Sequence, residues 1–182
     1  MKLSVIVPCY NESRTLRQCI ERVLEIADES LSLEVVIVDD CSTDESPAIA
    51  RELEQAHSQI VLVTHEKNQG KGAALRNGIK KATGDFVAVQ DADLEYDPND
   101  LKRILAPLVK GDADVVLRRA PEVIVFDRAF LAPQPLALEA FLAAARSPTE
   151  QLLVQDRRFF ERYGLRCVPT PMGFVHYLER VD

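Results

Sequence analysis

The sequence lacks the patterns that mark several large classes of protein. No run of about 18 apolar residues is present, so no membrane-spanning helix is expected. The apolar part of the amino-terminal stretch MKLSVIVPCY is too short for a signal peptide. The four cysteines form no CxxC pair, which argues against a zinc site and predicts reduced thiols in a cytoplasmic protein.

Basic residues are fewer than acidic ones. The chain has 22 Lys and Arg against 29 Asp and Glu, which gives a formal net charge of -7 at pH 7. Proteins that bind nucleic acid present a basic face, so this composition argues against a nucleic-acid partner. It leaves open an anionic ligand that is held through a metal ion.

Common catalytic and nucleotide-binding motifs are missing too. The three histidines, His57, His65 and His176, show no spacing typical of a Ser-His-Asp triad, and each is interpreted as structural or solvated. The glycine-containing loop NQGKG, residues 68–72, has neither the GxxxxGK[ST] nor the GxGxxG spacing. A Walker-type or dinucleotide-binding loop is therefore not expected.

What the sequence does contain is a regular alternation of short apolar runs and amphipathic segments. Its 182 residues, 47% of them hydrophobic, suffice for one domain or one domain with an appendage. The pattern predicts strands at 3–8, 34–40, 60–64, 85–91 and 113–117, and helices at 11–28, 46–57, 70–82 and 98–110. This order predicts an α/β fold, Rossmann-like, with three α/β/α layers and a mostly parallel central sheet.

The composition changes near residue 118. Residues 118–182 contain nine Arg, no Lys and six of the ten prolines, with a net charge of +1 against -8 for residues 1–117. Further strands are predicted at 122–131 and 165–171, and helices at 135–147 and 150–164. We expect a βαβ half over 1–117 and a divergent segment over 118–182, which completes the same domain or has a foreign origin.

Polar clusters follow four of the predicted strands. They are PCYNE at 8–12, DDCSTD at 39–44, NQGKG at 68–72 and DADLE at 91–95. The carboxyl ends of parallel strands share one edge of a sheet, where ligands of such folds bind. We therefore expect the four loops to converge on one site, which is a more specific signal than any single motif.

Each cluster has a chemical interpretation and a plainer alternative. Asp91 and Asp93 lie on the same side of an extended backbone and can share Mg²⁺ or Mn²⁺, unless they belong to a solvated acidic loop. Asp40 is suited to accept a hydrogen bond from a nucleobase ring N–H, although DDCSTD also supplies helix-capping residues. Lys71 and the N–H groups of the following helix form an anion site, or the loop is a glycine entry to a packed helix.

Taken together, SVIVPCYNE, VVIVDDCSTD and NQGKGAALRNGIKKATGDFVAVQDADLEYDP resemble glycosyltransferase family 2. The closest resemblance is to the polyprenyl-phosphate glycosyltransferases of the dolichyl-phosphate mannose synthase type. It covers about residues 3–117. The resemblance implies a GT-A fold, a nucleotide-diphosphate sugar donor and a divalent metal, Mg²⁺ or Mn²⁺.

The resemblance also implies roles for individual residues. Nucleotide-sugar binding would involve Pro8, Tyr10, Glu12, Asp40, Lys71, Asp91 and Asp93. Among them, Asp40 would contact the base, and Lys71 would approach the donor from the third loop. Asp91 and Asp93 would also be the catalytic residues that hold the metal and diphosphate, and Glu95 would complete the metal site.

The implied reaction is an inverting transfer of a hexose from GDP-mannose or UDP-glucose to a polyprenyl or dolichyl phosphate. A phosphate acceptor is already ionised near neutral pH and needs no general base, whereas a hydroxyl acceptor would need a carboxylate such as Glu150 or Asp156. Access to a lipid phosphate would need a separate partner or peripheral adsorption to a membrane surface.

The sequence departs from the family pattern after residue 117. The stretch ADVVLRRAPE, residues 113–122, stands where a Gly-Ser-Arg type stretch is usual, and Arg118 and Arg119 are expected to bind the acceptor phosphate in a shifted register. One alternative is a GT-A-like nucleotide-sugar-binding protein, truncated or chimeric, with little or no transferase activity. A sugar-phosphate nucleotidyltransferase is disfavoured because PCYNES contains no glycine.

Overall fold

The computed structural model describes residues 1–94, 97–111, 115–119, 122–127, 165–169 and 175–180. The chain divides into two units, Met1–Lys102 and Arg103–Asp182. The change of composition near residue 118 falls inside the second unit, and the predicted division at that residue stays a prediction. Within the described part of the chain, no helix combines the length and the apolar character needed to cross a membrane.

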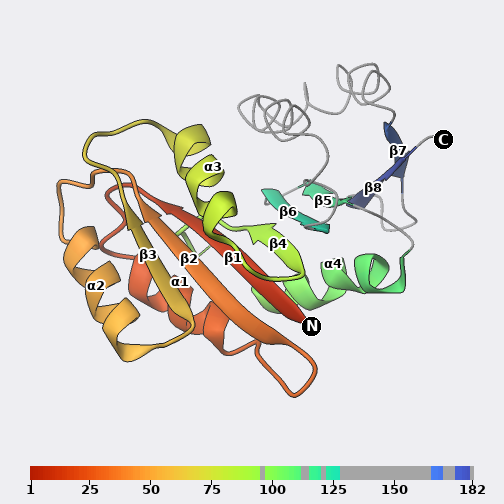
Figure 1. The fold of residues 1–182 in the computed structure, drawn as a ribbon, viewed down its shortest axis with the longest axis horizontal. Coiled ribbons are helices and arrows are strands. Elements are labelled where there is room, and N and C mark those ends of the chain that lie inside the picture. The colour runs from red at the N-terminus through yellow and green to blue at the C-terminus, as the bar shows by residue number, and fades with distance from the viewer. Residues whose placement is uncertain (95–96, 112–114, 120–121, 128–164, 170–174, 181–182) are drawn as a thin grey trace. The chain divides into compact units, whose positions relative to one another are not determined.

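The first unit alternates strands and helices around a parallel sheet (Figure 1). In chain order the elements are β1 (Lys2–Cys9), α1 (Leu16–Leu24), β2 (Ser32–Asp39), α2 (Ser46–Ala56), β3 (Ile60–Thr64), α3 (Lys71–Lys81), β4 (Phe86–Val89) and α4 (Asn99–Lys110), which runs into the second unit. The strand order is β3-β2-β1-β4, and every neighbouring pair is parallel. The predicted α/β architecture with a parallel sheet is confirmed.

The helices lie on both sides of these four strands. Helix α1 packs beside α2, and α3 packs on β1 and β2 from the other side (Figure 1). The connections from β1 to β2 and from β2 to β3 run in one direction across the sheet, and the connection from β3 to β4 runs in the other. Because crossovers between parallel strands are right-handed, the helix of the third connection lies on the opposite face. The sheet is therefore covered on both faces.

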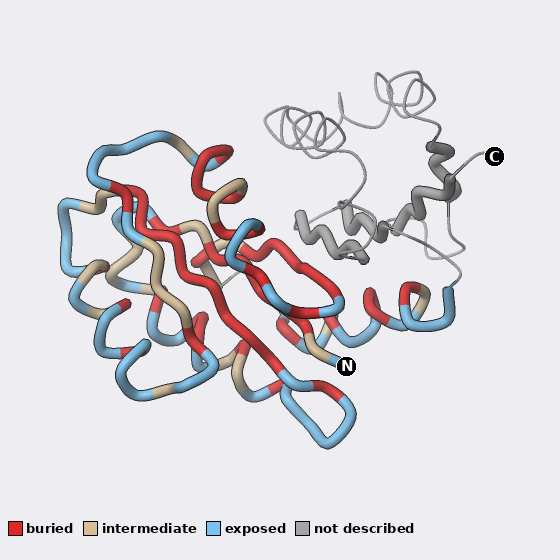
Figure 2. The backbone as a smooth tube through the Cα atoms, in the orientation of Figure 1, coloured by how far each residue is buried: buried red, intermediate tan, exposed pale blue. Residues whose placement is uncertain are grey.

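Burial on both faces explains the continuous apolar runs of the central strands. Val5, Ile6 and Val7 of β1 are fully buried, as are the apolar residues 35–38 of β2 (Figure 2). Helix α3 comes unusually close to this surface at Gly78. A Cβ atom there would lie 2.4 Å from the Ile6 Cγ2 atom, so the absence of a side chain permits the approach.

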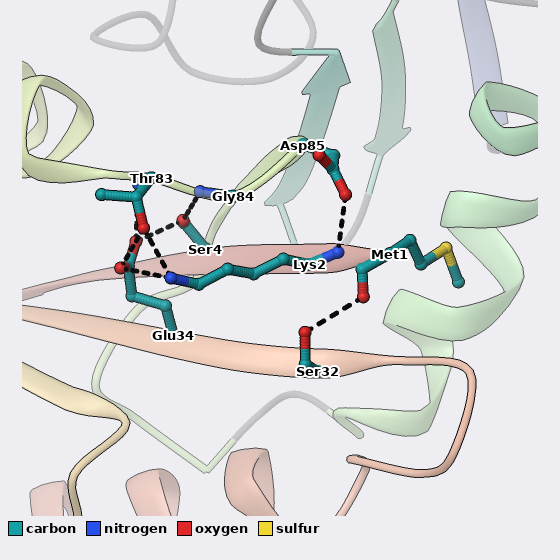
Figure 3. Close-up of polar contacts among 8 residues, drawn as sticks. All are labelled: Met1, Lys2, Ser4, Ser32, Glu34, Thr83, Gly84 and Asp85. Carbon is teal, nitrogen blue, oxygen red and sulfur yellow. Dashed lines mark hydrogen bonds and ion pairs between the residues drawn. The ribbon is translucent and has the colours of Figure 1, made fainter.

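A polar network fastens the amino-terminal ends of β1 and β2 to the segment before β4 (Figure 3). The Glu34 carboxylate accepts hydrogen bonds from the Ser4 hydroxyl (2.5 Å), the Thr83 N–H (2.7 Å) and the Thr83 hydroxyl (2.5 Å). It also pairs with the Lys2 ammonium at 2.9 Å. The Ser4 oxygen in turn accepts a bond from the Gly84 N–H at 2.8 Å. Every acceptor position of this buried carboxylate is therefore used by the fold.

The described strands of the second unit form an antiparallel arrangement. They are β5 (Val115–Arg119), β6 (Glu122–Asp127), β7 (Leu165–Pro169) and β8 (Val175–Arg180), in the order β6-β5-β8-β7. Strands β6 and β7 confirm the strands predicted at 122–131 and 165–171. Strand β8 was not predicted, because VHYLER contains no apolar run. The helices predicted at 135–147 and 150–164 lie outside the described residues.

Candidate functional site

A pocket of about 230 Å³ lies at the carboxyl ends of the strands of the first unit. Its walls come from the loops after β1, β2 and β4 and from the start of α3. The lining residues are Pro8, Cys9, Tyr10, Glu12, Asp40, Lys71, Ala74, Asp91, Ala92 and Asp93. The structure thus brings together all the residues that were predicted to bind a nucleotide sugar.

Three other predicted site residues are not part of this set. Glu95, the expected third metal ligand, lies outside the described residues. Arg118 and Arg119, the expected acceptor-phosphate residues, belong to β5 of the second unit. Their roles stay predictions.

The loops after β1 and β2 are tied to each other by hydrogen bonds. The Asn11 N–H donates to the Ser42 hydroxyl oxygen at 3.0 Å, and the Asn11 side-chain oxygen accepts from the Thr43 N–H at 2.8 Å. The Glu12 N–H donates to the Ser46 hydroxyl oxygen at 2.8 Å. Asn11 adopts a left-handed φ of 58°, which asparagine tolerates better than most residues. These bonds hold the wall of the pocket that carries Tyr10 in one conformation.

Tyr10 is the large exposed side chain of this wall. It is 48% exposed although it lines the pocket. An aromatic ring that keeps a free face in water is suited to stack on a planar ligand group such as a nucleobase. The neighbouring Cys9 is unsuited to nucleophilic chemistry, because burial raises the pKa of its thiol to about 11.

Asp40 is held by three hydrogen bonds from the loop that follows β3. Its Oδ1 atom lies 2.6 Å from the His65 Nδ1 atom and accepts from the Gln69 N–H at 2.8 Å, and its Oδ2 atom accepts from the Gly70 N–H at 2.7 Å. Burial raises the pKa of Asp40, but the bonds from Gln69, His65 and Gly70 outweigh it and lower the pKa below the usual value. A carboxylate offers about four acceptor positions, so one remains on a side chain that lines the pocket.

His65 contacts this site through Asp40, although no sequence pattern singled it out. Its ring is buried, with a side-chain exposure of 4%. Its Nε2 atom lies 2.8 Å from the Asn77 Nδ2 atom, which donates, so the ring proton is assigned to Nδ1 and points to Asp40. The one available signal was its position directly after β3, at the same sheet edge as the other loops.

Asp91 and Asp93 form the acidic wall of the pocket, and a lysine pairs with Asp91. The Lys71 Nζ atom lies 2.6 Å from Asp91 Oδ1 and 2.8 Å from Asp91 Oδ2. The negative charge of this wall also affects the pKa of the buried thiol of Cys19. Burial is the main cause that raises the pKa of the Cys19 thiol to about 11, and the carboxylates of Asp93 and Asp91 add to the increase.

The chemistry of this wall suits a hard divalent cation. Mg²⁺ in nucleotide sites is commonly bound by one or two carboxylates, and phosphate and water oxygens take its other positions. Asp91 and Asp93 supply such a pair, and Asp91 already has a cationic group beside both of its oxygens. Among the described residues, no three or more His, Cys, Asp or Glu side chains are grouped to hold a metal. The described residues therefore fit a metal site with two protein ligands, Asp91 and Asp93. Glu95 was predicted as a third ligand.

Comparisons with known proteins include the residues that line this pocket and extend beyond them. The sequence model of "Glycosyl transferase family 2" matches residues 4–167. "Succinoglycan biosynthesis protein ExoO" from Rhizobium meliloti is 33% identical over 178 residues, which are 90% of this chain and 50% of the relative. "Dolichol-phosphate mannosyltransferase" from Pyrococcus furiosus is 33% identical over 117 residues, which are 64% of this chain and 32% of that protein.

A solved structure shares the fold. It is a mannosyltransferase from Pyrobaculum calidifontis in complex with GDP-Man and Mn²⁺, 27% identical, with a TM-score of 0.61 over 71% of this chain and 45% of that one. Such neighbours confirm the predicted GT-A fold. The chain spans half or less of the length of each of these three proteins.

Proposed function

Because the chain belongs to glycosyl transferase family 2, we propose that it binds a nucleotide-diphosphate sugar with Mg²⁺ or Mn²⁺ and transfers the hexose. The proposed donor is GDP-mannose or UDP-glucose, and the proposed acceptor is a polyprenyl or dolichyl phosphate at a membrane surface. Two similar proteins support this choice. One is named a dolichol-phosphate mannosyltransferase, and the other is solved with GDP-Man and Mn²⁺.

The observation that carries the proposal is the pocket formed by three loops and the start of α3. It combines an exposed aromatic ring, Tyr10, with an anchored carboxylate, Asp40, that has one acceptor position left. These groups suit a base with a ring N–H donor. Lys71, Asp91 and Asp93 lie in the same pocket and suit a diphosphate with its metal ion.

In the proposed reaction, an oxygen of the acceptor phosphate forms a bond to the anomeric carbon of the sugar. The bond from that carbon to the diphosphate oxygen breaks on the opposite face, and the nucleoside diphosphate leaves with the electron pair. The bound metal ion would stabilise the negative charge that develops on the departing diphosphate. Arg118 and Arg119 are proposed to contact the acceptor phosphate, which is ionised near neutral pH and needs no base.

A second candidate function is donor binding with little or no transfer. It is favoured by the stretch ADVVLRRAPE, which departs from the family pattern where acceptor-side residues are expected. This candidate shares the donor pocket with the first and differs in the fate of the sugar. A binding assay therefore tests what the two have in common, and a transfer assay separates them.

The binding assay is a thermal-shift panel of GDP- and UDP-sugars with and without Mn²⁺. We expect stabilisation by one class of base that grows when the metal is added, because a ligand that binds only the folded protein raises its stability. The substitution Asp93→Asn should remove the metal-dependent part. Asp28→Asn is the matched control, because it makes the same charge change at an exposed ion pair with Lys102.

The transfer assay uses a donor labelled in its hexose and a polyprenyl phosphate. Label extracted into the organic phase supports the transferase. Binding without extractable label supports the second candidate. Stabilisation by nucleotide sugars that is the same with and without metal, in both the unmodified protein and Asp93→Asn, contradicts the metal assignment.

A further inference from the structure

Lys71 bridges the two carboxylate oxygens of Asp91, the atoms that would bind a metal ion. Its ammonium lies within 2.8 Å of both carboxylate oxygens, so neither oxygen is free of this cation. A metal ligated by Asp91 would lie about 2.1 Å from one of the same oxygens. An ammonium group that bridges both oxygens takes the acceptor positions on its side of the carboxylate and repels a divalent ion that approaches the same oxygens.

We propose that Lys71 is an exchangeable counter-ion, which pairs with Asp91 in the metal-free protein and moves to the donor diphosphate when the metal binds. The inference rests on the proposed function, because it needs a metal ion and a diphosphate in this pocket. It adds to the proposed function a sequence of two states, in which Lys71 first pairs with Asp91 and then with the diphosphate. The lysine neutralises the charge of Asp91 until the metal ion binds and neutralises it instead.

The surroundings of Lys71 confine this movement to its side chain. The backbone just before it is fixed, because the Gln69 and Gly70 N–H groups both donate to Asp40. The Lys71 side chain itself is 54% exposed, and the Asp91 side chain is 32% exposed. A lysine has a long flexible stem, so it can change its partner without a movement of the main chain.

The exchange predicts opposite effects of Lys71 on the two ligands. In the absence of nucleotide, Lys71 competes with the metal. Removing a single positive charge about 6 Å from a divalent ion in a water-like dielectric should raise the metal affinity about tenfold. With the metal bound, Lys71 instead contributes to the diphosphate site, so its removal should weaken the binding of a nucleoside diphosphate by a similar factor.

The test compares Mn²⁺ binding by the full chain and by three variants, with free Mn²⁺ measured by electron paramagnetic resonance. Lys71→Met removes the charge and keeps most of the apolar stem, and Lys71→Arg keeps the charge. Lys102→Met is the matched control, because Lys102 forms an exposed ion pair with Asp28 at 2.6 Å. GDP and UDP are then titrated at saturating Mn²⁺ by calorimetry.

We expect Lys71→Met to bind Mn²⁺ about tenfold more tightly than the unmodified protein without nucleotide, and to bind GDP or UDP more weakly with Mn²⁺. Lys102→Met should change neither affinity, and Lys71→Arg should not gain Mn²⁺ affinity. Measurable Mn²⁺ binding that Lys71→Met leaves unchanged or weakens overturns the exchange alone, and the proposed function stands. No Mn²⁺ binding by any variant, with or without nucleotide, overturns both.

Discussion

The network around Glu34 should make the stability of the protein depend on pH in the acid range. Burial raises the pKa of Glu34, but the hydrogen bonds from Ser4, Thr83 and Lys2 outweigh it and lower the pKa from 4.5 to about 2. A group whose pKa is lower in the folded state contributes stability that is complete above its unfolded pKa. This contribution should therefore be present above about pH 4.5 and be lost as the pH falls towards 2.

The size of the effect follows from the change in proton affinity. A tenfold change in proton affinity corresponds to about 1.4 kcal/mol, so a pKa lowered from 4.5 to about 2 corresponds to about 3 kcal/mol. The Glu34 side chain is only 9% exposed, so solvent screens these contacts little. A domain is typically stable by about 5–15 kcal/mol, which makes this carboxylate a substantial part of the total.

The substitution Glu34→Gln tests this reasoning. Glutamine has one acceptor oxygen, and its amide N–H groups would face donors, so the unfolding free energy at pH 7 should fall by about 3 kcal/mol. Far-UV circular dichroism in urea measures this, since the chain has no tryptophan. The control is Glu52→Gln, which alters an exposed pair with Arg17 and should cost less than about 1 kcal/mol.

The pH profile separates the network from a general packing effect. Between pH 5 and 2.5 the unmodified protein should lose more stability than Glu34→Gln, because the variant has no carboxylate to protonate at this position. If both proteins lose the same stability over this interval, the hydrogen bonds do not depress the pKa of Glu34 and the reasoning is refuted.

Substitutions at three further positions test the packing and the pocket. Gly78→Ala places a Cβ atom 2.4 Å from the Ile6 Cγ2 atom, so thermal denaturation should show a loss of about 1–3 kcal/mol despite the better helix propensity of alanine. His65→Phe removes a hydrogen bond to Asp40 and should weaken the binding of a nucleoside diphosphate at least several-fold, as measured by calorimetry. Unchanged affinity would mean that His65 does not position Asp40. Tyr10→Ala should lower the same affinity about threefold to tenfold, whereas Tyr10→Phe should retain it if the ring stacks on the base.

The convergence of the loops could be predicted from sequence because it depends on topology alone. Once apolar runs indicate a parallel sheet, the residues after each strand must meet at one edge, which is why Asp40, Lys71 and Asp91 were expected together. The same argument needs no side-chain positions. Every predicted site residue of the first unit that the structure describes does line the pocket.

Contacts between side chains of different loops could not be predicted in this way. Asn77 reaches His65 only because of the rotational register of α3, which the sequence pattern leaves open. The pairing of Lys71 with Asp91 depends on the path of two loops 20 residues apart. Strand β8 was missed for a different reason, since a short strand of mixed polarity carries little periodic signal.

The two edges of the same parallel sheet use buried carboxylates in different ways. The fold saturates all the acceptor positions of Glu34 at the amino edge, whereas Asp40 at the carboxyl edge keeps one position on a side chain that lines the pocket. A saturated carboxylate can stabilise the protein but has nothing left to offer a ligand. Changes at Glu34 should therefore alter stability at constant nucleotide affinity. Changes at Asp40 should alter both, because the same carboxylate fixes the loop before Lys71 and retains an acceptor for the base.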